Sequence, residues 1–341
     1  MISRDELQLA ARNHGFPLEL LREPITPVGL HYLLIHFDIP AVDTGMWRLE
    51  IGGLVDRPLV LSLDDLKARE QRTLAVTLEC AGNGRALLPN HEPSQPWLAD
   101  AVGTARWTGT PLAALLAEAG VDASTHSISF TGLDRGFQGG VEHAYARGLT
   151  LDEAREPDVL LAYEMNAAPL LPQHGYPLRL VVPGWYGMTH VKWLHSIAAI
   201  PEPFDGWQQT EAYTIDGEPV TRMLPRSLLV PPGIPDFLTR ERTVDEGRTT
   251  IKGRAWSGFG EITRVAFSAD GGTTWRDTTL EPPVDRHAWR GWHVDWDAEP
   301  GRHELSCRAT DAGGNTQPLE GTWNHGGYCN NSVQRVPVNV R

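Results

Sequence analysis

Alternation between apolar and polar residues in the first two hundred positions predicts several short strands. Residues 48–54 and 59–63 alternate in this way. Between Thr73 and Cys80 the apolar residues recur at every second position, so one face of this expected strand is apolar. The small and turn-forming residues 81–85 must end it. Further strands are expected at 127–130, 178–182 and 190–197.

Helical signals are fewer and shorter. Ser62 is a suitable N-cap for a short helix, and Pro111 and Gly120 frame a second one with an N-terminal proline and a C-terminal glycine. Thr150 and Glu153 form a capping-box pattern. Short helices among strands predict an α+β fold, here a mixed α/β domain.

The pattern changes after about residue 200, where prolines mark an extended connection. Short alternating segments then follow at 249–255, 265–269, 291–295, 303–310 and 333–340, with turn signals between them. This spacing is typical of an all-β immunoglobulin-like sandwich. We therefore expect two domains, residues 1–222 and 223–341.

Composition and charge exclude several classes of function. The 341 residues carry a net charge of −13, which argues against binding of nucleic acid or of an anionic membrane surface. The sequence contains no run of about 18 apolar residues, and its first residues resemble no secretory signal, so a cytoplasmic protein is expected. The three cysteines include no C-x-x-C pair, which argues against zinc ribbons and haem attachment.

Cys80 is the first candidate for chemistry. Its place on an apolar strand face is typical of a packed core cysteine. The small residues that follow would nevertheless allow a ligand to approach the backbone, and Arg85 would stabilise a thiolate that can bind a soft metal. Packing and metal binding both remain open from this pattern alone.

Two later segments contain candidate anion-binding groups. His174 and Arg179 flank a loop before an expected strand, and His190 and Lys192 follow a glycine-containing turn. A structural loop and an aromatic turn explain these segments as well as an anion site does. Each signal is weak by itself.

Five motifs, taken together, resemble the sulfite oxidase family in order and spacing. They are residues 79–85 (ECAGNGR), 103–109 (GTARWTG), 161–166 (LAYEMN), 174–179 (HGYPLR) and 190–194 (HVKWL). The resemblance implies a mononuclear molybdenum–molybdopterin cofactor, with one protein cysteine on the metal, and a C-terminal dimerisation domain.

The resemblance also implies roles for individual residues. Cys80 matches the molybdenum ligand. Arg85, Tyr145 and, less securely, Trp97 match the substrate pocket, to which the sandwich would add Arg286. The residues that match or adjoin the cofactor-binding positions are Tyr32, His36, Asp134, His174, Arg179, His190, Val191 and Lys192.

One departure from the family changes the expected substrate. Leu34 and Ile35 stand where the family has an arginine that contacts the substrate oxyanion and an asparagine. Residues 12–14 (RNH) look like the missing motif but lie too far before Cys80, so we interpret them as a coincidence. Loss of a positive charge predicts weaker binding of a dianion such as sulfite and better binding of a less charged or partly apolar substrate.

The expected function is oxygen-atom transfer on a small sulfur-containing substrate. The resemblance implies a homodimer, and no haem is expected in this chain, so electrons would pass to or from a separate carrier such as a cytochrome. Sulfite oxidation, S-oxide reduction and an N-oxide or nitrate reductase activity remain open, as does a cofactor-binding protein with little turnover. Residues 268–275 also resemble a single sialidase-type Asp-box, which leaves a glycan-acting or glycan-binding sandwich protein as an alternative.

Overall fold

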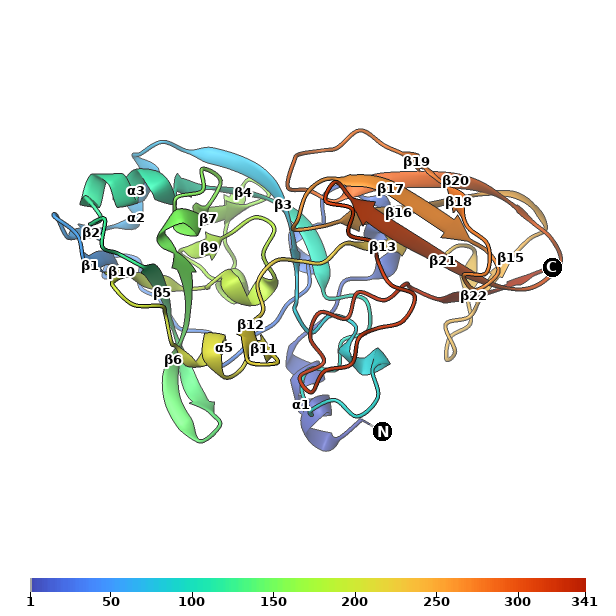
Figure 1. Cartoon of the computed structure of the whole chain (residues 1–341), viewed down its shortest axis with the longest axis horizontal. Helices are drawn as coiled ribbons and strands as arrows, with labels where there is room; N and C mark the ends of the chain where they lie inside the picture. Colours follow the sequence, from blue (N-terminus) through green and yellow to red (C-terminus); the bar gives the residue numbers. More distant parts are fainter. Residues whose placement is uncertain (1) are drawn as a thin grey trace.

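The structure is a computed structural model that describes residues 2–341. Figure 1 shows two halves side by side, with the earlier part of the chain in one half and the last part in a sandwich of two sheets. Over the described range, no helix is long and apolar enough to cross a membrane. The expected α+β domain followed by a β-sandwich is confirmed.

Two sheets build the first half. One has the strand order β2 (Leu59–Leu61), β1 (Leu49–Gly53), β10 (Leu194–Ile200), β5 (Ser127–Gln138) and β6 (Val141–Thr150). The other has the order β3 (Arg72–Glu79), β4 (Val102–Pro111), β7 (Leu160–Met165) and β8 (Ala168–Pro169), with β9 (Arg179–Val181) paired to β7. Strand β3 ends where motif 79–85 begins, and β9 begins where motif 174–179 ends. Both strands belong to one sheet, which brings these two motifs into the same part of the fold.

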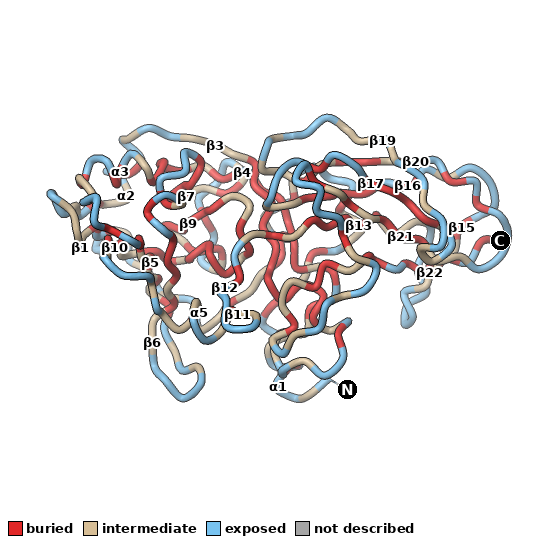
Figure 2. The backbone as a smooth tube through the Cα atoms, in the orientation of Figure 1, coloured by how far each residue is buried: buried red, intermediate tan, exposed pale blue. Residues whose placement is uncertain are grey.

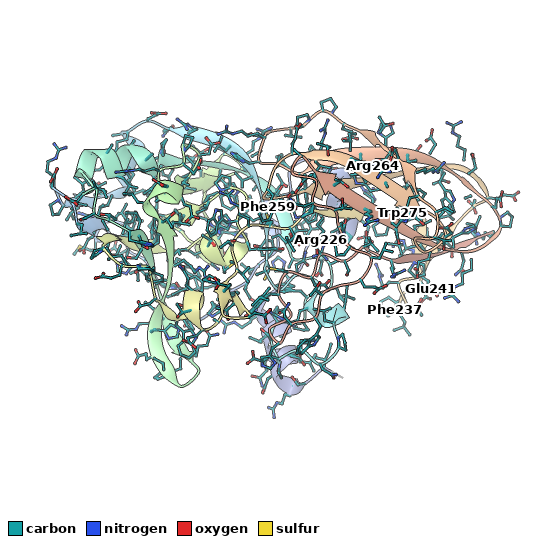
Figure 3. The ribbon with its side chains drawn as sticks, viewed as in Figure 1. Arg226, Phe237, Glu241, Phe259, Arg264 and Trp275 are labelled. Atoms are coloured by element: carbon teal, nitrogen blue, oxygen red, sulfur yellow. The ribbon has the colours of Figure 1, made fainter. Side chains whose placement is uncertain are left out.

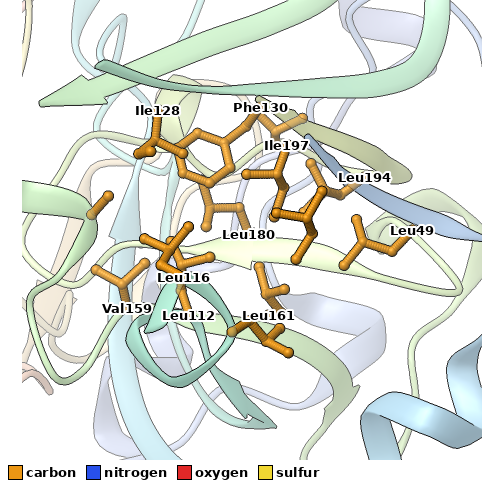
Figure 4. Packing of buried hydrophobic residues seen from close by; sticks show 14 of the residues in the cluster. Leu49, Leu112, Leu116, Ile128, Phe130, Val159, Leu161, Leu180, Leu194 and Ile197 are labelled. Atoms are coloured by element: carbon orange, nitrogen blue, oxygen red, sulfur yellow. The ribbon is translucent and has the colours of Figure 1, made fainter. Parts of the chain in front are cut away.

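The first half also contains short helices. They are α1 (Arg4–Arg12), α2 (Leu63–Lys67), α3 (Leu112–Ala119), α4 (Leu151–Ala154) and α5 (Trp207–Thr210), with the 3-10 turns η1 (Leu18–Arg22), η2 (Val28–Leu30), η3 (Arg85–Leu87), η4 (Pro172–His174) and η5 (Gly187–Thr189). Ser62 and Thr150 cap α2 and α4 through capping boxes, as the sequence predicts. Figure 4 shows Leu112 and Leu116 of α3 packed with side chains of the surrounding strands such as Leu161 and Leu180.

The second half is a sandwich of two sheets. One has the order β13 (Arg226–Leu229), β16 (Gly247–Trp256), β20 (Arg290–Ala298) and β19 (Thr279–Leu280). The other has the order β14 (Ile234–Pro235), β15 (Arg242–Val244), β22 (Val336–Val340), β21 (Gly301–Asp311), β17 (Ile262–Ser268) and β18 (Arg276–Asp277). A small hairpin, β11 (Thr214–Ile215) and β12 (Glu218–Pro219), precedes the sandwich.

A shared core joins the two halves. Buried Phe16, Ala81 and Tyr186 of the first half pack in one cluster with Trp256 and Trp289 of the sandwich. Figure 2 shows buried backbone running through the region where the halves meet. The cluster includes Ala81, the residue directly after Cys80, so the junction reaches the candidate site.

One expected strand differs from the structure. Residues 190–193 are not a strand, because η5 ends just before them and Trp193 has φ +49°. The strand β10 begins only at Leu194. His190 and Lys192 therefore lie on a turn, where their side chains need not alternate between two faces.

Candidate active site

Cys80 follows strand β3 directly and begins a tight turn. Its amide nitrogen donates to the carbonyl oxygen of Ala101 at 2.9 Å. Gly84 has φ +88°, a conformation that favours glycine. A Cβ atom on Gly82 would lie 2.6 Å from Arg85 Nη2. The glycines therefore allow the turn and let the Arg85 guanidinium fold back against it.

Cys80 lies where two cavities meet, and it lines both. The first, which we call the basic cavity, has about 680 Å³ of space not filled by protein atoms, and the second, the funnel, has about 790 Å³, both including open solvent. Leu34, His36 and Tyr213 also line both cavities. The basic cavity further contains Tyr32, Asp134, Tyr145, Gln173, His174, Arg179, His190 and Lys192. The funnel further contains Leu9, Ile35, Phe37, Arg85, Gln95, Trp97, Phe137, Gln138 and Tyr328.

The Cys80 thiol is not a free thiolate in this environment. Burial raises its pKa, although the positive charge of Arg85 opposes the rise. The predicted stabilising effect of Arg85 is therefore present but smaller than the cost of burial. A coordinating cation would remove the proton, since metal-bound thiols are deprotonated.

Lys192 and Asp134 are oppositely charged groups of the basic cavity. Lys192 Nζ donates to the Leu34 carbonyl oxygen at 2.6 Å and to the Gln173 carbonyl oxygen at 3.4 Å. Burial, with repulsion from Arg179, lowers the pKa of Lys192 to about 7. Burial raises the pKa of Asp134 to about 6, although Lys192 opposes the rise. An anion bound beside Lys192 would restore its positive charge.

His174 and Arg179 form the rest of the cationic wall. Arg179 Nη1 donates to the His174 carbonyl oxygen at 3.2 Å, and its guanidinium lies 4.7 Å from the centre of the Trp107 ring. Burial lowers the pKa of Arg179 to about 10, so it is charged at neutral pH. Burial and neighbouring cationic groups lower the pKa of His174 to about 2, so it is neutral.

Of the two neighbouring residues His190 and Val191, only His190 lines the basic cavity. The His190 Nδ1 accepts from the Val182 amide at 3.0 Å and its Nε2 faces the Trp185 carbonyl oxygen at 3.1 Å. Both ring nitrogens of His190 thus form hydrogen bonds with backbone groups. The Val191 side chain is fully buried in the core and does not line the cavity, so the expected contact of Val191 with the cofactor stays a prediction.

Arg85 is the cation of the funnel. Its Nε donates to the Gly326 carbonyl oxygen at 2.7 Å, its Nη1 donates to the Gln95 carbonyl oxygen at 3.1 Å, and it lies 5.1 Å from the centre of the Tyr328 ring. Within residues 2–341, its Nη2 has no hydrogen-bond partner. The guanidinium is therefore fixed in place with one nitrogen left for a ligand.

Besides Arg85, the lining of the funnel is mixed, with polar side chains such as Gln95 and Gln138 facing apolar ones. Leu34 lines it together with Ile35, Phe37 and Trp97. Trp97 is 3% exposed, and in the described part of the chain its indole nitrogen has no hydrogen-bond partner. Leu34 and Cys80 line the same two cavities, and the role of Leu34 in substrate choice stays a prediction. Residues 12–14 line neither cavity, although Asn13 Oδ1 accepts from the Ile35 amide at 2.7 Å.

Two tyrosines lie near Cys80, and only one faces the funnel. Tyr145 lines the basic cavity, and its hydroxyl donates to the Met188 carbonyl oxygen at 2.7 Å. Tyr213 lines both cavities, and burial raises its pKa well above the ordinary value. The assignment of Tyr145 to the substrate pocket stays a prediction, and Tyr213 is a further candidate because it lines both cavities. No motif identified Tyr213, whose position depends on the fold of residues 207–220.

Arg286 lies in a different cleft. Its guanidinium pairs with Asp158, and its side chain is 63% exposed. The next residue, His287, is fixed beside β3 because its carbonyl oxygen accepts from the Thr77 amide at 3.0 Å. The cleft around Arg286 contains neither Cys80 nor Arg85, so the structure does not bring Arg286 together with the other predicted substrate-pocket residues. The sandwich instead reaches the funnel through residues 326–330, which include Tyr328.

The Asp-box segment is a structural turn between β17 and β18. Asp270 Oδ1 accepts from the Thr274 amide at 2.9 Å and from Ser268 Oγ at 2.7 Å, and Gly271 and Gly272 have positive φ values. These bonds lower the pKa of Asp270 to about 2. The Asp270 carboxylate therefore forms its hydrogen bonds within its own hairpin.

The comparisons with known proteins first define a class. Residues 36–208 match the family model "Oxidoreductase molybdopterin binding domain", and residues 223–341 match "Mo-co oxidoreductase dimerisation domain". This architecture is that of the molybdopterin-binding oxidoreductases.

Similar proteins narrow the class to a family. The chain is 37% identical to human mitochondrial sulfite oxidase over 95% of its length, and it spans 63% of that protein. It is 36% identical to chicken (Gallus gallus) sulfite oxidase, of which it covers 74%. The solved sulfane dehydrogenase SoxCD from Paracoccus pantotrophus matches 96% of this chain and 86% of its own, with a TM-score of 0.82 and 29% identity. The chain therefore belongs to the sulfite oxidase family.

The basic cavity fits the cofactor of this family. In the range 2–341, Asp134 Oδ1 and Arg179 Nε are buried without hydrogen-bond partners. A pterin offers amide and amine donors, and its phosphate offers anionic acceptors, which match these two groups. The soft sulfur of Cys80 lies at the edge of the same cavity and suits a molybdenum ion.

Proposed function

We propose that this protein is a molybdenum-cofactor oxidoreductase that transfers an oxygen atom on a small sulfur-containing substrate. The observation that carries the proposal is the position of Cys80 between a basic cavity and a funnel that combines Arg85 with apolar side chains such as Leu34 and Trp97. The cavity suits an anionic cofactor, and the funnel suits a substrate. Membership of the sulfite oxidase family supports the reaction type.

The cofactor, when bound, supplies two-electron redox chemistry next to a sulfur lone pair. In the oxidising direction the substrate sulfur gains one oxygen atom from water, and two protons and two electrons leave. The electrons pass to a separate carrier, for which we propose a cytochrome. The matching dimerisation domain supports a homodimer as the working form.

The residues of the basic cavity hold the cofactor. Lys192 and Arg179 bind its phosphate by charge-assisted hydrogen bonds, and Asp134 accepts from the pterin edge. His174 remains neutral because of its lowered pKa, and it therefore adds polarity without charge. Cys80 donates the sulfur ligand.

The residues of the funnel orient the substrate. Arg85 Nη2 binds the oxygen on which negative charge develops, and the protonated hydroxyl of Tyr213 donates to the same oxygen. Leu34 and Trp97 exclude water and contact apolar substituents. This combination favours sulfur compounds with low charge or an apolar group over the sulfite dianion.

A substrate screen with an artificial electron carrier tests the proposal. The molybdenum-loaded protein is assayed against sulfite, organic sulfides, S-oxides, N-oxides and nitrate. We expect the highest kcat/KM with a sulfur compound. Turnover confined to nitrate or N-oxides, or no turnover of any substrate, would contradict the proposed reaction.

Metal analysis tests the ligand separately. We expect about one molybdenum per chain in the native protein and nearly none in Cys80→Ser, because the hydroxyl is a poor ligand for a soft site. Cys307→Ser is the matched control, since Cys307 is buried inside the sandwich. Full occupancy in Cys80→Ser would show that Cys80 is not the ligand.

A further inference from the structure

The residue directly before Cys80 forms a buried ion pair. Glu79 Oε1 accepts from Arg226 Nη1 at 2.9 Å, and the two side chains are 2% and 3% exposed. Glu79 ends strand β3 in the first half, whereas Arg226 begins strand β13 of the sandwich. Figure 3 labels Arg226 near the junction of the two halves. The pair therefore links the metal-ligand turn to the second domain.

The Glu79 carboxylate receives three N–H donors on its two oxygens. Besides Arg226, Asn83 Nδ2 donates to Oε1 at 2.9 Å, and Trp256 Nε1 donates to Oε2 at 2.7 Å. A carboxylate is the side chain that can accept all three, because an amide has only one acceptor oxygen. Glutamine at this position would turn an N–H group toward another donor.

The same partners hold the rest of the turn. Arg226 Nη1 also donates to the carbonyl oxygens of Asn83 at 3.2 Å and Asn330 at 2.8 Å. Asn330 Nδ2 donates to the Gly84 carbonyl oxygen at 2.8 Å. The carboxylate and the sandwich thus fix the turn from the side that faces away from the cavities.

Successive side chains along a strand point to opposite faces. The end of β3 therefore directs Glu79 toward the sandwich and Cys80 toward the cavities. Fixing the carboxylate fixes the backbone from which Cys80 Sγ projects. A small rotation of the backbone at Glu79 would change the direction in which Cys80 Sγ points between the two cavities.

We propose that Glu79 is a positioning residue for Cys80 and that Arg226 and Trp256 of the sandwich hold Glu79 in place. The role of Cys80 as metal ligand rests on the proposed function, whereas the effect of Glu79 on the geometry of Cys80 does not. In this view the C-terminal domain completes the ligand turn in addition to any role in dimerisation.

A pair of matched tryptophan variants separates positioning from general stability. Trp256→Phe removes the N–H donated to Glu79. Trp289→Phe removes an N–H donated to the Pro24 carbonyl oxygen at 2.8 Å. The two rings lie in the same core cluster, 6.3 Å apart. A merely structural role predicts similar effects of both substitutions.

The first measurement uses the cofactor-free protein. The rate of Cys80 alkylation by iodoacetamide is followed by mass spectrometry of the Cys80 peptide, so Cys307 and Cys329 do not interfere. We expect Trp256→Phe to raise this rate about tenfold, because a hydrogen bond to a charged group is lost. Trp289→Phe should leave it unchanged. No change in Trp256→Phe, or equal changes in both variants, would overturn the proposal.

The second measurement uses molybdenum-loaded protein and Glu79→Gln. We expect a lower molybdenum content and faster molybdenum loss on dialysis than in Trp289→Phe. Native content and native loss rate would overturn the proposal. If Glu79→Gln does not fold, the alkylation result decides. Molybdenum retained in Cys80→Ser would contradict the ligand assignment alone, since the alkylation test needs no metal.

Discussion

Leu34 places an apolar side chain where the two cavities meet. An arginine there would add a charge-assisted hydrogen bond to an anionic substrate. We therefore expect Leu34→Arg to lower the KM for sulfite about tenfold. Leu238→Arg, at an exposed position of the sandwich that lines neither cavity, is the control and should change KM little. Steady-state kinetics with sulfite measures both, and an unchanged KM in Leu34→Arg would refute this account of substrate choice.

Lys192 gives the cofactor-free protein a defined pH dependence. Burial lowers its pKa from 10.5 to about 7. Between these values the unfolded chain holds a proton that the folded chain lacks, so the contribution of Lys192 to the free energy of unfolding rises with pH. We expect wild type to gain stability relative to Lys192→Met as the pH increases from 7 toward 10.5.

Urea unfolding at neutral and alkaline pH measures this difference. Lys67→Met is the control, because Lys67 is exposed on α2, and its difference from wild type should not depend on pH in the same way. A constant difference between wild type and Lys192→Met at all pH values would contradict the lowered pKa.

At the residue scale, the sequence predicts backbone position better than side-chain direction. Cys80, Arg85 and Lys192 line the cavities as expected, because each lies in an ordered motif with fixed spacing. Tyr213 was missed because nothing nearby in the sequence marks it. The pairing of Arg286 with Asp158 was not predicted, because the two residues are distant in sequence and such a pairing is not visible along the chain.

At the scale of elements, the turn after β3 requires a residue without a Cβ atom at Gly82. A Cβ atom there would collide with the Arg85 guanidinium at 2.6 Å. We expect Gly82→Ala to displace Arg85 and to lower the free energy of unfolding by about 1–3 kcal/mol through overpacking. Substrate turnover should fall as well.

Gly29→Ala is the matched control for this prediction. Gly29 lies in η2, and no atom stands within 4 Å of its would-be Cβ. Its free energy of unfolding should change little or rise slightly. Thermal or urea unfolding of both variants provides the measurement. Similar stability of the two variants would show that the contact between Gly82 and Arg85 does not constrain the turn.

Local signals predict elements well where the chain carries its own caps or alternation. Ser62 and Thr150 start helices in the structure, and β3 covers almost the whole alternating run before Cys80. The segment 190–193 is apolar enough to resemble a strand, but the left-handed backbone of Trp193 interrupts it. That conformation depends on tertiary packing, since Trp193 is fully buried and its indole nitrogen donates to the Pro172 carbonyl oxygen at 2.8 Å.

At the scale of the whole molecule, the sequence suggests two separate domains, but their contacts cannot be read from it. Arg226 and Trp256 lie 147 and 177 positions after Glu79, yet both donate to its buried carboxylate. Hydrogen bonds between residues so far apart in the sequence form only when both domains have folded. The division into two domains therefore understates how strongly the halves depend on each other.

The shared core predicts that the two halves unfold together. Separation would expose the apolar cluster around Trp256 and Trp289 and leave Glu79 and Arg226 without partners, which is costly for buried charges. Calorimetry of the cofactor-free protein should therefore show one cooperative transition.

A substitution deep in the sandwich tests this coupling. Ile251 is 1% exposed in the sandwich core, far in sequence from Cys80. Ile251→Ala should lower the free energy of unfolding by about 2–5 kcal/mol. With coupled halves, the temperature at which Cys80 becomes reactive toward iodoacetamide must fall together with the calorimetric midpoint. If the calorimetric trace splits and Cys80 stays protected to the native temperature, the halves unfold independently, and the sandwich does not support the ligand turn during unfolding.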